Sequence, residues 1–240
     1  MSKIIPKVIH FCWFGGGQKP EIVKRCMASW AKRLPDYELM EWNESNFNID
    51  LFDFTRQAYN DKNYAFVSDA ARAFVLNEFG GIYLDTDVEV FKNFDDLLDE
   101  EFFAGFEQGG YIGTCVMGAQ KNAAILKEYL DYYSSLSYWQ PDGKKHKDTN
   151  VVLLTKLLEE KGIKKDDSLQ RVEGITVFPR TYFSPYDYIN GENFISSDSY
   201  CVHHFAKLWL PRRVRLKAAI KKIVIKIVGP ETLKALRQKL

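Results

Sequence analysis

The amino-terminal part of the chain alternates between strand-like and helix-like apolar patterns. Residues 8–13, VIHFCW, form a short β-prone run that ends at Gly15-Gly16-Gly17. Apolar side chains then recur at helical spacing over residues 22–30, Leu34-Pro35 stops that pattern, and residues 37–42 form a second β-prone run. A strand, a helix and a strand within about 35 residues are the unit of a parallel α/β sheet. The pattern therefore predicts an α/β fold.

A second segment of this kind ends in two carboxylates. Ser68 is the predicted N-cap of a helix over residues 69–79, and Gly80 is placed to end that helix in a left-handed conformation. A short apolar strand follows, and Asp85 and Asp87 come where it ends. Ligands of open α/β sheets bind beyond the carboxyl ends of the strands. The position of the two aspartates therefore indicates a functional site.

The spacing of Asp85 and Asp87 favours a hard divalent cation. Residues i and i+2 of an extended segment project to the same side, so both carboxylates can reach one ion. Mg²⁺ and Mn²⁺ take one or two protein carboxylates and fill their other positions with water and phosphate oxygens. The chain has no P-loop, no dinucleotide-binding glycine fingerprint, no zinc-protease helix and no serine-hydrolase elbow. A metal that holds a diphosphate leaving group remains the favoured chemistry.

Upstream, Asp69 and Arg72 lie at i and i+3 of the predicted helix, where they share a face and can meet one ligand. Simpler interpretations stand beside the functional ones. An Asp-x-Asp pair can be a solvated strand edge, and Asp69 and Arg72 can form an ordinary ion pair on a helix surface. Two other functions stay open as well: a metal-dependent phosphohydrolase, and a catalytically silent module that binds nucleotide or glycan.

Three motifs in this order resemble glycosyltransferase family 32, which includes initiating mannosyltransferases and bacterial capsule-synthesis enzymes. The motifs are Ile5-Pro6-Lys7-x-Ile9-His10-x-x-Trp13-x-Gly15-Gly16, Ser68-Asp69-x-x-Arg72 and Gly80-Gly81-x-Tyr83-x-Asp85-x-Asp87. The resemblance implies a GT-A type fold, with a Rossmann-like mixed sheet flanked by helices. It also implies a hexosyltransferase that uses Mn²⁺ or Mg²⁺, transfers with retention of anomeric configuration, and takes a nucleotide-sugar donor, a UDP-sugar rather than a GDP-sugar.

The same resemblance assigns roles to individual residues. Trp13 would stack on the nucleobase, although a core aromatic is the alternative, and Asp69 and Arg72 would hold the donor sugar. Tyr83 would line the donor pocket. Asp85 would contact the ribose or the metal, and Asp87 would bind the metal.

A second part of the expected site lies near the carboxyl end. His203 and His204 follow a short apolar strand in a segment that resembles the His-His and Ser-Trp pattern of bacterial relatives, except that Leu208 replaces the serine. His204 is expected to be the third metal ligand, and Trp209 to close over the donor. The sequence identifies no catalytic residue. Glu107 and Asn150 are weaker candidates for contacts, and a solvated loop position is the simpler interpretation of Glu107.

The charge distribution divides the chain into a glycosyltransferase domain over residues 1–210 and a basic segment over residues 211–240. The segment holds ten Lys and Arg against Glu231 alone. Within it, residues 212–228 place apolar side chains at helical spacing among seven basic ones, which predicts an amphipathic helix that binds an anionic membrane surface. A helix packed on the domain or on another subunit is the alternative. Nucleic-acid binding is disfavoured because the segment lacks an aromatic platform.

The remaining features concern the cellular location. The four cysteines have no C-x-x-C spacing, which favours free thiols in a reducing compartment. The amino terminus reaches Pro6 and Lys7 after two apolar residues, so it lacks the continuous apolar core of a signal peptide. We therefore expect a cytoplasmic protein, peripheral on the inner face of the membrane. Its expected acceptor is a lipid-linked glycan of bacterial capsular polysaccharide synthesis.

Overall fold

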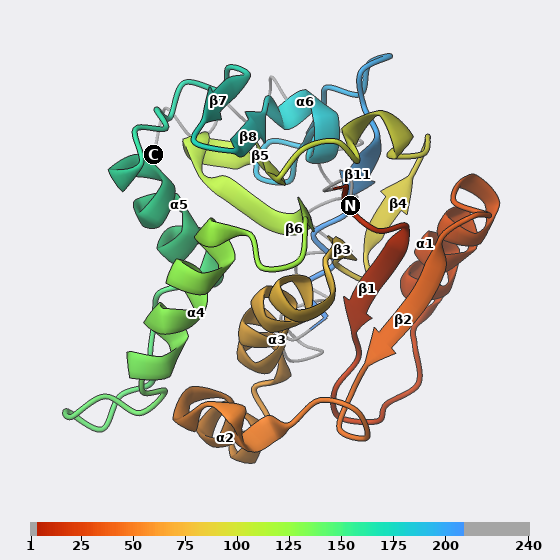
Figure 1. Ribbon diagram of the computed structural model, residues 1–240. Helices are drawn as coiled ribbons and strands as arrows, with labels where there is room; N and C mark the ends of the chain where they lie inside the picture. The colour runs from red at the N-terminus through yellow and green to blue at the C-terminus, as the bar shows by residue number, and fades with distance from the viewer. Residues whose placement is uncertain (1–3, 209–240) are drawn as a thin grey trace, which may run out of the picture.

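The computed structural model describes residues 4–208, and it confirms the predicted α/β fold (Figure 1). A mixed seven-stranded sheet forms its centre, in the order β2-β1-β3-β6-β5-β8-β7. The strands of this sheet are β1 (Val8–Cys12), β2 (Glu38–Trp42), β3 (Gly81–Leu84), β5 (Phe102–Phe106), β6 (Ile112–Ala119), β7 (Gln170–Val172) and β8 (Ile175–Phe178). Two small antiparallel pairs complete the strands: β4 (Val88–Val90) with β11 (Cys201–His203), and β9 (Tyr186–Asp187) with β10 (Glu192–Asn193).

Six α-helices connect the strands within the described residues. They are α1 (Glu21–Arg33), α2 (Asp53–Asn60), α3 (Tyr64–Phe79), α4 (Ala124–Ser135), α5 (Asn150–Glu160) and α6 (Arg180–Phe183). The expected start of α3 at Ser68 is wrong. The helix begins one turn earlier, with Asn63 as its N-cap, and the Ser68 hydroxyl donates to the Tyr64 carbonyl from inside the helix. A serine within a helix can satisfy itself this way, so its presence does not mark a helix start.

Gly80 ends α3 as expected, with φ of +66°. Its ψ of −172° lies outside the left-handed helical region, in a region that glycine alone enters readily. A Cβ on Gly80 would also meet the backbone nitrogen of Lys121 at 2.9 Å. The glycine therefore turns the chain directly from α3 into β3, whose next residues lead to Asp85.

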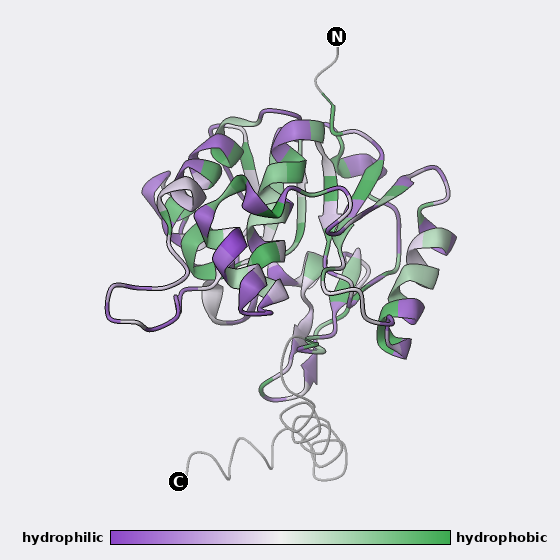
Figure 2. Cartoon of the chain, turned by 90° about the horizontal axis from the view of Figure 1, so that it is seen from below, coloured by the Kyte–Doolittle hydropathy of each residue, from purple (hydrophilic) through white to green (hydrophobic). Residues whose placement is uncertain are grey.

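Helices cover both faces of the sheet, so the core has two halves. Residues of α2, α3, α4 and α5 form one cluster with the sheet side chains that include Tyr83 and Met117. Trp30 of α1 and Phe183 of α6 belong to the other cluster, with Ile82 and Leu84. Successive residues of β3 thus point to opposite clusters, as the pleat requires. Figure 2 shows hydrophobic residues along the interior strands and helices in which hydrophobic and hydrophilic residues alternate.

The strand directions decide where the site forms. β1 runs parallel to β2 and β3, β3 and β5 both run antiparallel to β6, and β5 runs parallel to β8. The carboxyl ends of β1, β3, β5 and β8 therefore lie at one edge of the sheet. Trp13 follows β1, Asp85 follows β3 and Glu107 follows β5, all at this edge.

All four cysteines are unpaired and buried. No helix within residues 4–208 has both the length and the apolar character needed to cross a lipid bilayer. Trp209 and the basic segment of residues 211–240 lie outside the described residues, so the expectations for them stay predictions.

Candidate active site

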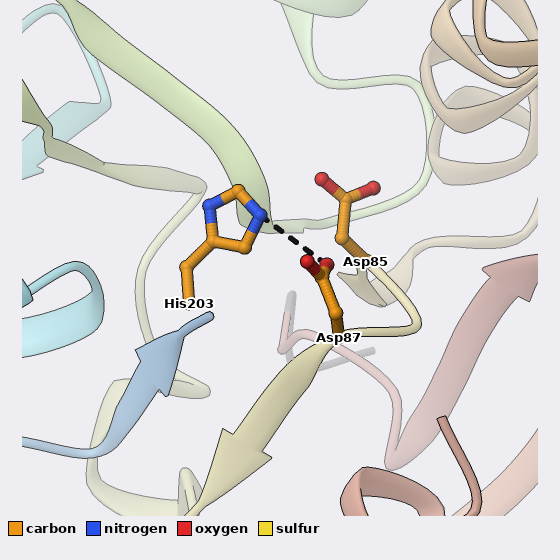
Figure 3. Close-up of side chains that lie close together, drawn as sticks. All are labelled: Asp85, Asp87 and His203. Atoms are coloured by element: carbon orange, nitrogen blue, oxygen red, sulfur yellow. Dashed lines mark ion pairs between the residues drawn. The ribbon is translucent and has the colours of Figure 1, made fainter. Parts of the chain in front are cut away.

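Two carboxylates and one imidazole converge beyond the end of β3. Single ligand atoms of Asp85, Asp87 and His203 all lie within 4.8 Å of one another (Figure 3). Asp85 follows β3, Asp87 precedes β4, and His203 ends β11, so three strands supply the cluster. Two oxygen donors and one imidazole nitrogen fit Mn²⁺, and Mg²⁺ accepts the carboxylates. The donor set therefore fits the divalent cation expected from the sequence.

The structure places His203, and not His204, beside the aspartates, which corrects the expected third ligand. β11 pairs with β4 in antiparallel register, with His203 opposite Val88. Adjacent residues of an extended segment point to opposite sides. The Nε2 atom of His203 consequently lies 3.2 Å from Asp87 Oδ1, whereas Nε2 of His204 lies 2.8 Å from Glu89 Oε2.

Asp87 is held as an ionised carboxylate. Burial by itself would raise its pKa, but the charge and hydrogen bond of His203 and the backbone N–H of Ala206 lower the pKa to about 2. The Ala206 N–H donates to Asp87 Oδ2 over 2.7 Å. Burial lowers the pKa of His203, and the Asp87 carboxylate outweighs it and raises that pKa well above its usual value. Because a metal-binding imidazole must be neutral, cation binding here would release a proton from His203.

Arg72 forms the centre of a second, buried network that fixes Asp85. Its Nη1 lies 3.1 Å from Asp85 Oδ1 and donates to the Thr114 carbonyl over 2.8 Å. Its Nη2 lies 3.0 Å from Asp69 Oδ1, and its Nε donates to the Ser68 carbonyl. The guanidinium group stacks over the ring of Tyr83 at 4.6 Å. The predicted closeness of Asp69 and Arg72 is thus confirmed, and Arg72 also links them to the Asp-x-Asp pair.

Asp69 depends on Arg72 for its charge. Burial raises the pKa of Asp69 to about 7, and the guanidinium of Arg72 and the backbone N–H of Asn150 oppose that rise. Asn150 begins α5, and its side-chain Nδ2 is buried without a hydrogen-bond partner among the described residues. A buried donor left without a partner is uncommon and marks a place where a ligand atom can bind. Asn150 therefore belongs beside Asp69 on the helical side of the site.

The other predicted donor-binding residues differ in how far they are buried. Trp13 is partly exposed, and its Nε1 donates to the Gly17 carbonyl, so its ring lies at the surface of the carboxyl edge rather than in the core. Tyr83 is 2% exposed, and its hydroxyl donates to Asp85 Oδ1. Tyr83 thus positions Asp85 from within the core instead of lining an open pocket. His10 is buried and bonded to the Gly80 carbonyl and to Trp42, so its role is structural.

Two contributors to the site carried no sequence signal. The backbone carbonyl and the hydroxyl of Thr114 accept hydrogen bonds from Arg72, and both contacts depend on the pairing of β6 with β3. Ala206 binds Asp87 through its backbone N–H, which any residue type other than proline supplies. A composition or motif search cannot find groups of this kind, because their role comes from tertiary position.

Comparison with known proteins agrees with this geometry. Residues 20–104 match the family model described as "Glycosyltransferase sugar-binding region containing DXD motif". The chain is 30% identical over 137 residues to inositol phosphoceramide mannosyltransferase 3 of Schizosaccharomyces pombe, an alignment that covers 54% of this chain and 37% of the relative. It is also 30% identical over 159 residues to subversion of eukaryotic traffic protein A of Legionella pneumophila, which covers 53% of this chain and 24% of the relative.

The chain thus spans less than two fifths of the length of either of these curated relatives. Among solved structures, the PaToxG glycosyltransferase superimposes with a TM-score of 0.54 at 21% identity, over 66% of this chain and 70% of that one. At that identity the likeness concerns the fold. The fold is therefore that of a GT-A glycosyltransferase, and the residues that match the sugar-binding family model include the Asp-x-Asp motif at residues 85–87.

Proposed function

We propose that this chain is a metal-dependent glycosyltransferase that moves a hexose from a nucleotide-diphosphate sugar to a glycan acceptor with retention of configuration. The observation that carries the proposal is the cluster of Asp85, Asp87 and His203 at the carboxyl edge of the sheet. Asp85 and Asp87 lie within residues 20–104, which match a glycosyltransferase family model, and His203 lies outside that match. Retention follows from the resemblance to family 32.

The residues of the site divide the work. Asp85, Asp87 and His203 would hold Mn²⁺ or Mg²⁺, which neutralises charge on the departing diphosphate. Arg72 fixes the Asp85 carboxylate, and the Ala206 N–H fixes Asp87, so neither ligand has to reorient when the donor binds. Trp13 offers a partly exposed ring for a nucleobase at the end of β1.

We also propose which donor and which acceptor the enzyme uses. For the donor we retain a UDP-sugar in preference to a GDP-sugar. The relative from S. pombe is by name a mannosyltransferase, which makes mannose a candidate sugar. For the acceptor we retain a lipid-linked glycan of bacterial capsular polysaccharide synthesis.

A screen of nucleotide sugars tests the proposed activity. We expect slow, Mn²⁺-dependent hydrolysis of one UDP- or GDP-sugar in the absence of an acceptor, with release of the nucleoside diphosphate. The measurement is chromatographic separation of the free sugar, nucleoside diphosphate and inorganic phosphate. Release of inorganic phosphate from phosphomonoesters, without cleavage of any nucleotide sugar, would instead identify a phosphohydrolase. Absence of binding to every donor would contradict the main proposal.

We also propose that residues 212–228 attach the enzyme to the inner face of an anionic membrane, while the domain itself is cytoplasmic. The seven basic residues of this segment support the proposal, since each contributes about 1 kcal/mol near an anionic surface. In a flotation assay with phosphatidylglycerol vesicles, the full chain should float, and a chain ending at residue 210 should remain in the dense fraction. Equal flotation of both chains would sink this proposal.

A further inference from the structure

We propose that Glu107 binds the sugar of the nucleotide-sugar donor and helps to select it. This inference rests on the proposed glycosyltransferase function and assigns to it a residue outside the family match, which ends at residue 104. Glu107 follows β5 directly, at the carboxyl edge of the sheet that also holds the cluster of Asp85, Asp87 and His203.

The order of the strands gives the direction in which a donor would lie. Along the carboxyl edge, β1 is followed by β3, then by the start of β6, then by the end of β5. Trp13 follows β1, Asp85 follows β3 and Glu107 follows β5. A nucleotide with its base at Trp13 and its diphosphate at the cluster therefore directs its sugar toward β6 and β5. Two strand spacings separate β3 from β5, roughly 10 Å, so a sugar beside the metal reaches the end of β5.

The glutamate side chain lies over a glycine of the neighbouring strand. A Cβ built on Gly113 of β6 would meet Glu107 Oε2 at 3.1 Å and Glu107 Cβ at 3.4 Å. Since Gly113 has no side chain, the carboxyl group of Glu107 can fold back across the sheet edge. A larger residue at position 113 would push it away.

The carboxylate of Glu107 makes no hydrogen bond and no ion pair with the described part of the chain. Its backbone N–H donates to the Tyr111 carbonyl, but its side-chain oxygens have no donor. The residue is only partly exposed. Gly113, which Glu107 covers, lies two residues before Cys115, whose carbonyl accepts the Asp85 N–H. Burial raises the pKa of Glu107, with His203 opposing the rise and Asp85 adding to it. A half-buried carboxylate without partners is a costly arrangement unless a ligand supplies the donors.

Aromatic rings extend from His203 of the cluster and offer a surface on which a sugar can pack. The rings of His203 and Phe205 lie 3.9 Å apart, and those of Phe205 and Tyr188 lie 4.5 Å apart. The charge of Glu107 contributes to a raised pKa of Tyr188, after the larger effect of burial. Hexose hydroxyl groups donate hydrogen bonds, and a carboxylate accepts several of them. The carboxylates of the cluster and of Asp69 already accept from protein groups: Asp69 from Arg72, Asp85 from Tyr83 and Asp87 from Ala206.

Binding measurements with and without the sugar test the proposal. In the presence of Mn²⁺, we compare the Kd of the nucleoside diphosphate with that of the nucleotide sugar that wild-type protein binds most tightly in the screen. Glu107→Gln should weaken binding of the nucleotide sugar about tenfold, the effect of losing charge-assisted hydrogen bonds, while the Kd of the nucleoside diphosphate changes less than twofold. The melting temperature should not fall, since the side chain bonds to no protein group and the amide carries no buried charge.

Glu101→Gln is the matched control, because Glu101 is a half-buried glutamate at the opposite end of the same strand. It should leave both dissociation constants unchanged. Unchanged nucleotide-sugar binding in Glu107→Gln, or equal losses for both ligands, would overturn the assignment of Glu107 alone. If wild-type protein binds no nucleotide sugar, the proposed function fails and this inference fails with it, which is a different result.

Discussion

Replacing Asp87 with Asn is expected to weaken Mn²⁺ binding at least about 100-fold and to slow donor cleavage about 10³-fold. The pKa of the Asp87 carboxylate is about 2, so at neutral pH the carboxylate carries a full negative charge toward the cation. An amide of the same shape keeps an oxygen for the Ala206 N–H but loses that charge. Isothermal titration with Mn²⁺, together with donor hydrolysis at saturating Mn²⁺, measures both effects.

Glu89→Gln provides the control for this experiment. Glu89 lies on β4 two residues beyond Asp87, and its carboxylate contacts His204 rather than the cluster. It should change Mn²⁺ affinity less than about threefold, because an outer charge acts only through screened Coulomb attraction. Equal losses in the two variants would show that Asp85, Asp87 and His203 do not form the metal site.

Short sequence patterns predicted the helices and strands whose formation depends on neighbouring residues. The β1-α1-β2 unit and the strand β3 followed from apolar periodicity, and both lie within about two residues of their predicted bounds. Asp85 and Asp87 followed from the same kind of evidence, since a strand end and a spacing of two residues are both visible in the sequence. The prediction failed at Ser68, where a hydroxyl bonded inside its own helix resembles an N-cap.

The choice between His203 and His204 shows what local patterns leave open. The side chains of two adjacent strand residues point to opposite faces of the strand. Only the register of β11 against β4 decides which of the two histidines faces Asp87. Those strands lie more than 100 positions apart in the sequence, so no short motif contains that register. Glu107 is similar. Its loop position suggested a solvated side chain, whereas the pairing of β5 with β6 places it over Gly113, two residues before Cys115, whose carbonyl accepts the Asp85 N–H.

Replacing Arg72 with Met is expected to lower the free energy of unfolding by about 3–5 kcal/mol, the usual cost of removing one partner from a buried ion pair. The Arg72 side chain is 6% exposed, and its loss leaves Asp69 and Asp85 without their shared cation. Asp69 then takes up a proton more readily, because burial already raises its pKa to about 7. Folded Asp69 thus holds its proton to higher pH than unfolded Asp69, so the loss of stability should be larger at pH 8 than at pH 6.

Urea unfolding at the two pH values measures this loss, and a second ion pair of the same spacing gives the control. Arg56 and Asp53 also lie at i and i+3 of a helix, but the Arg56 side chain is 48% exposed, so Arg56→Met should cost less than about 1 kcal/mol. Adding Asp69→Asn to Arg72→Met should recover part of the stability, since the stranded carboxylate is gone, without restoring donor binding. Equal unfolding midpoints for Arg72→Met and Arg56→Met would show that the buried network does not stabilise the fold. A double variant no more stable than Arg72→Met would show that the unpaired Asp69 is not the cause of the loss.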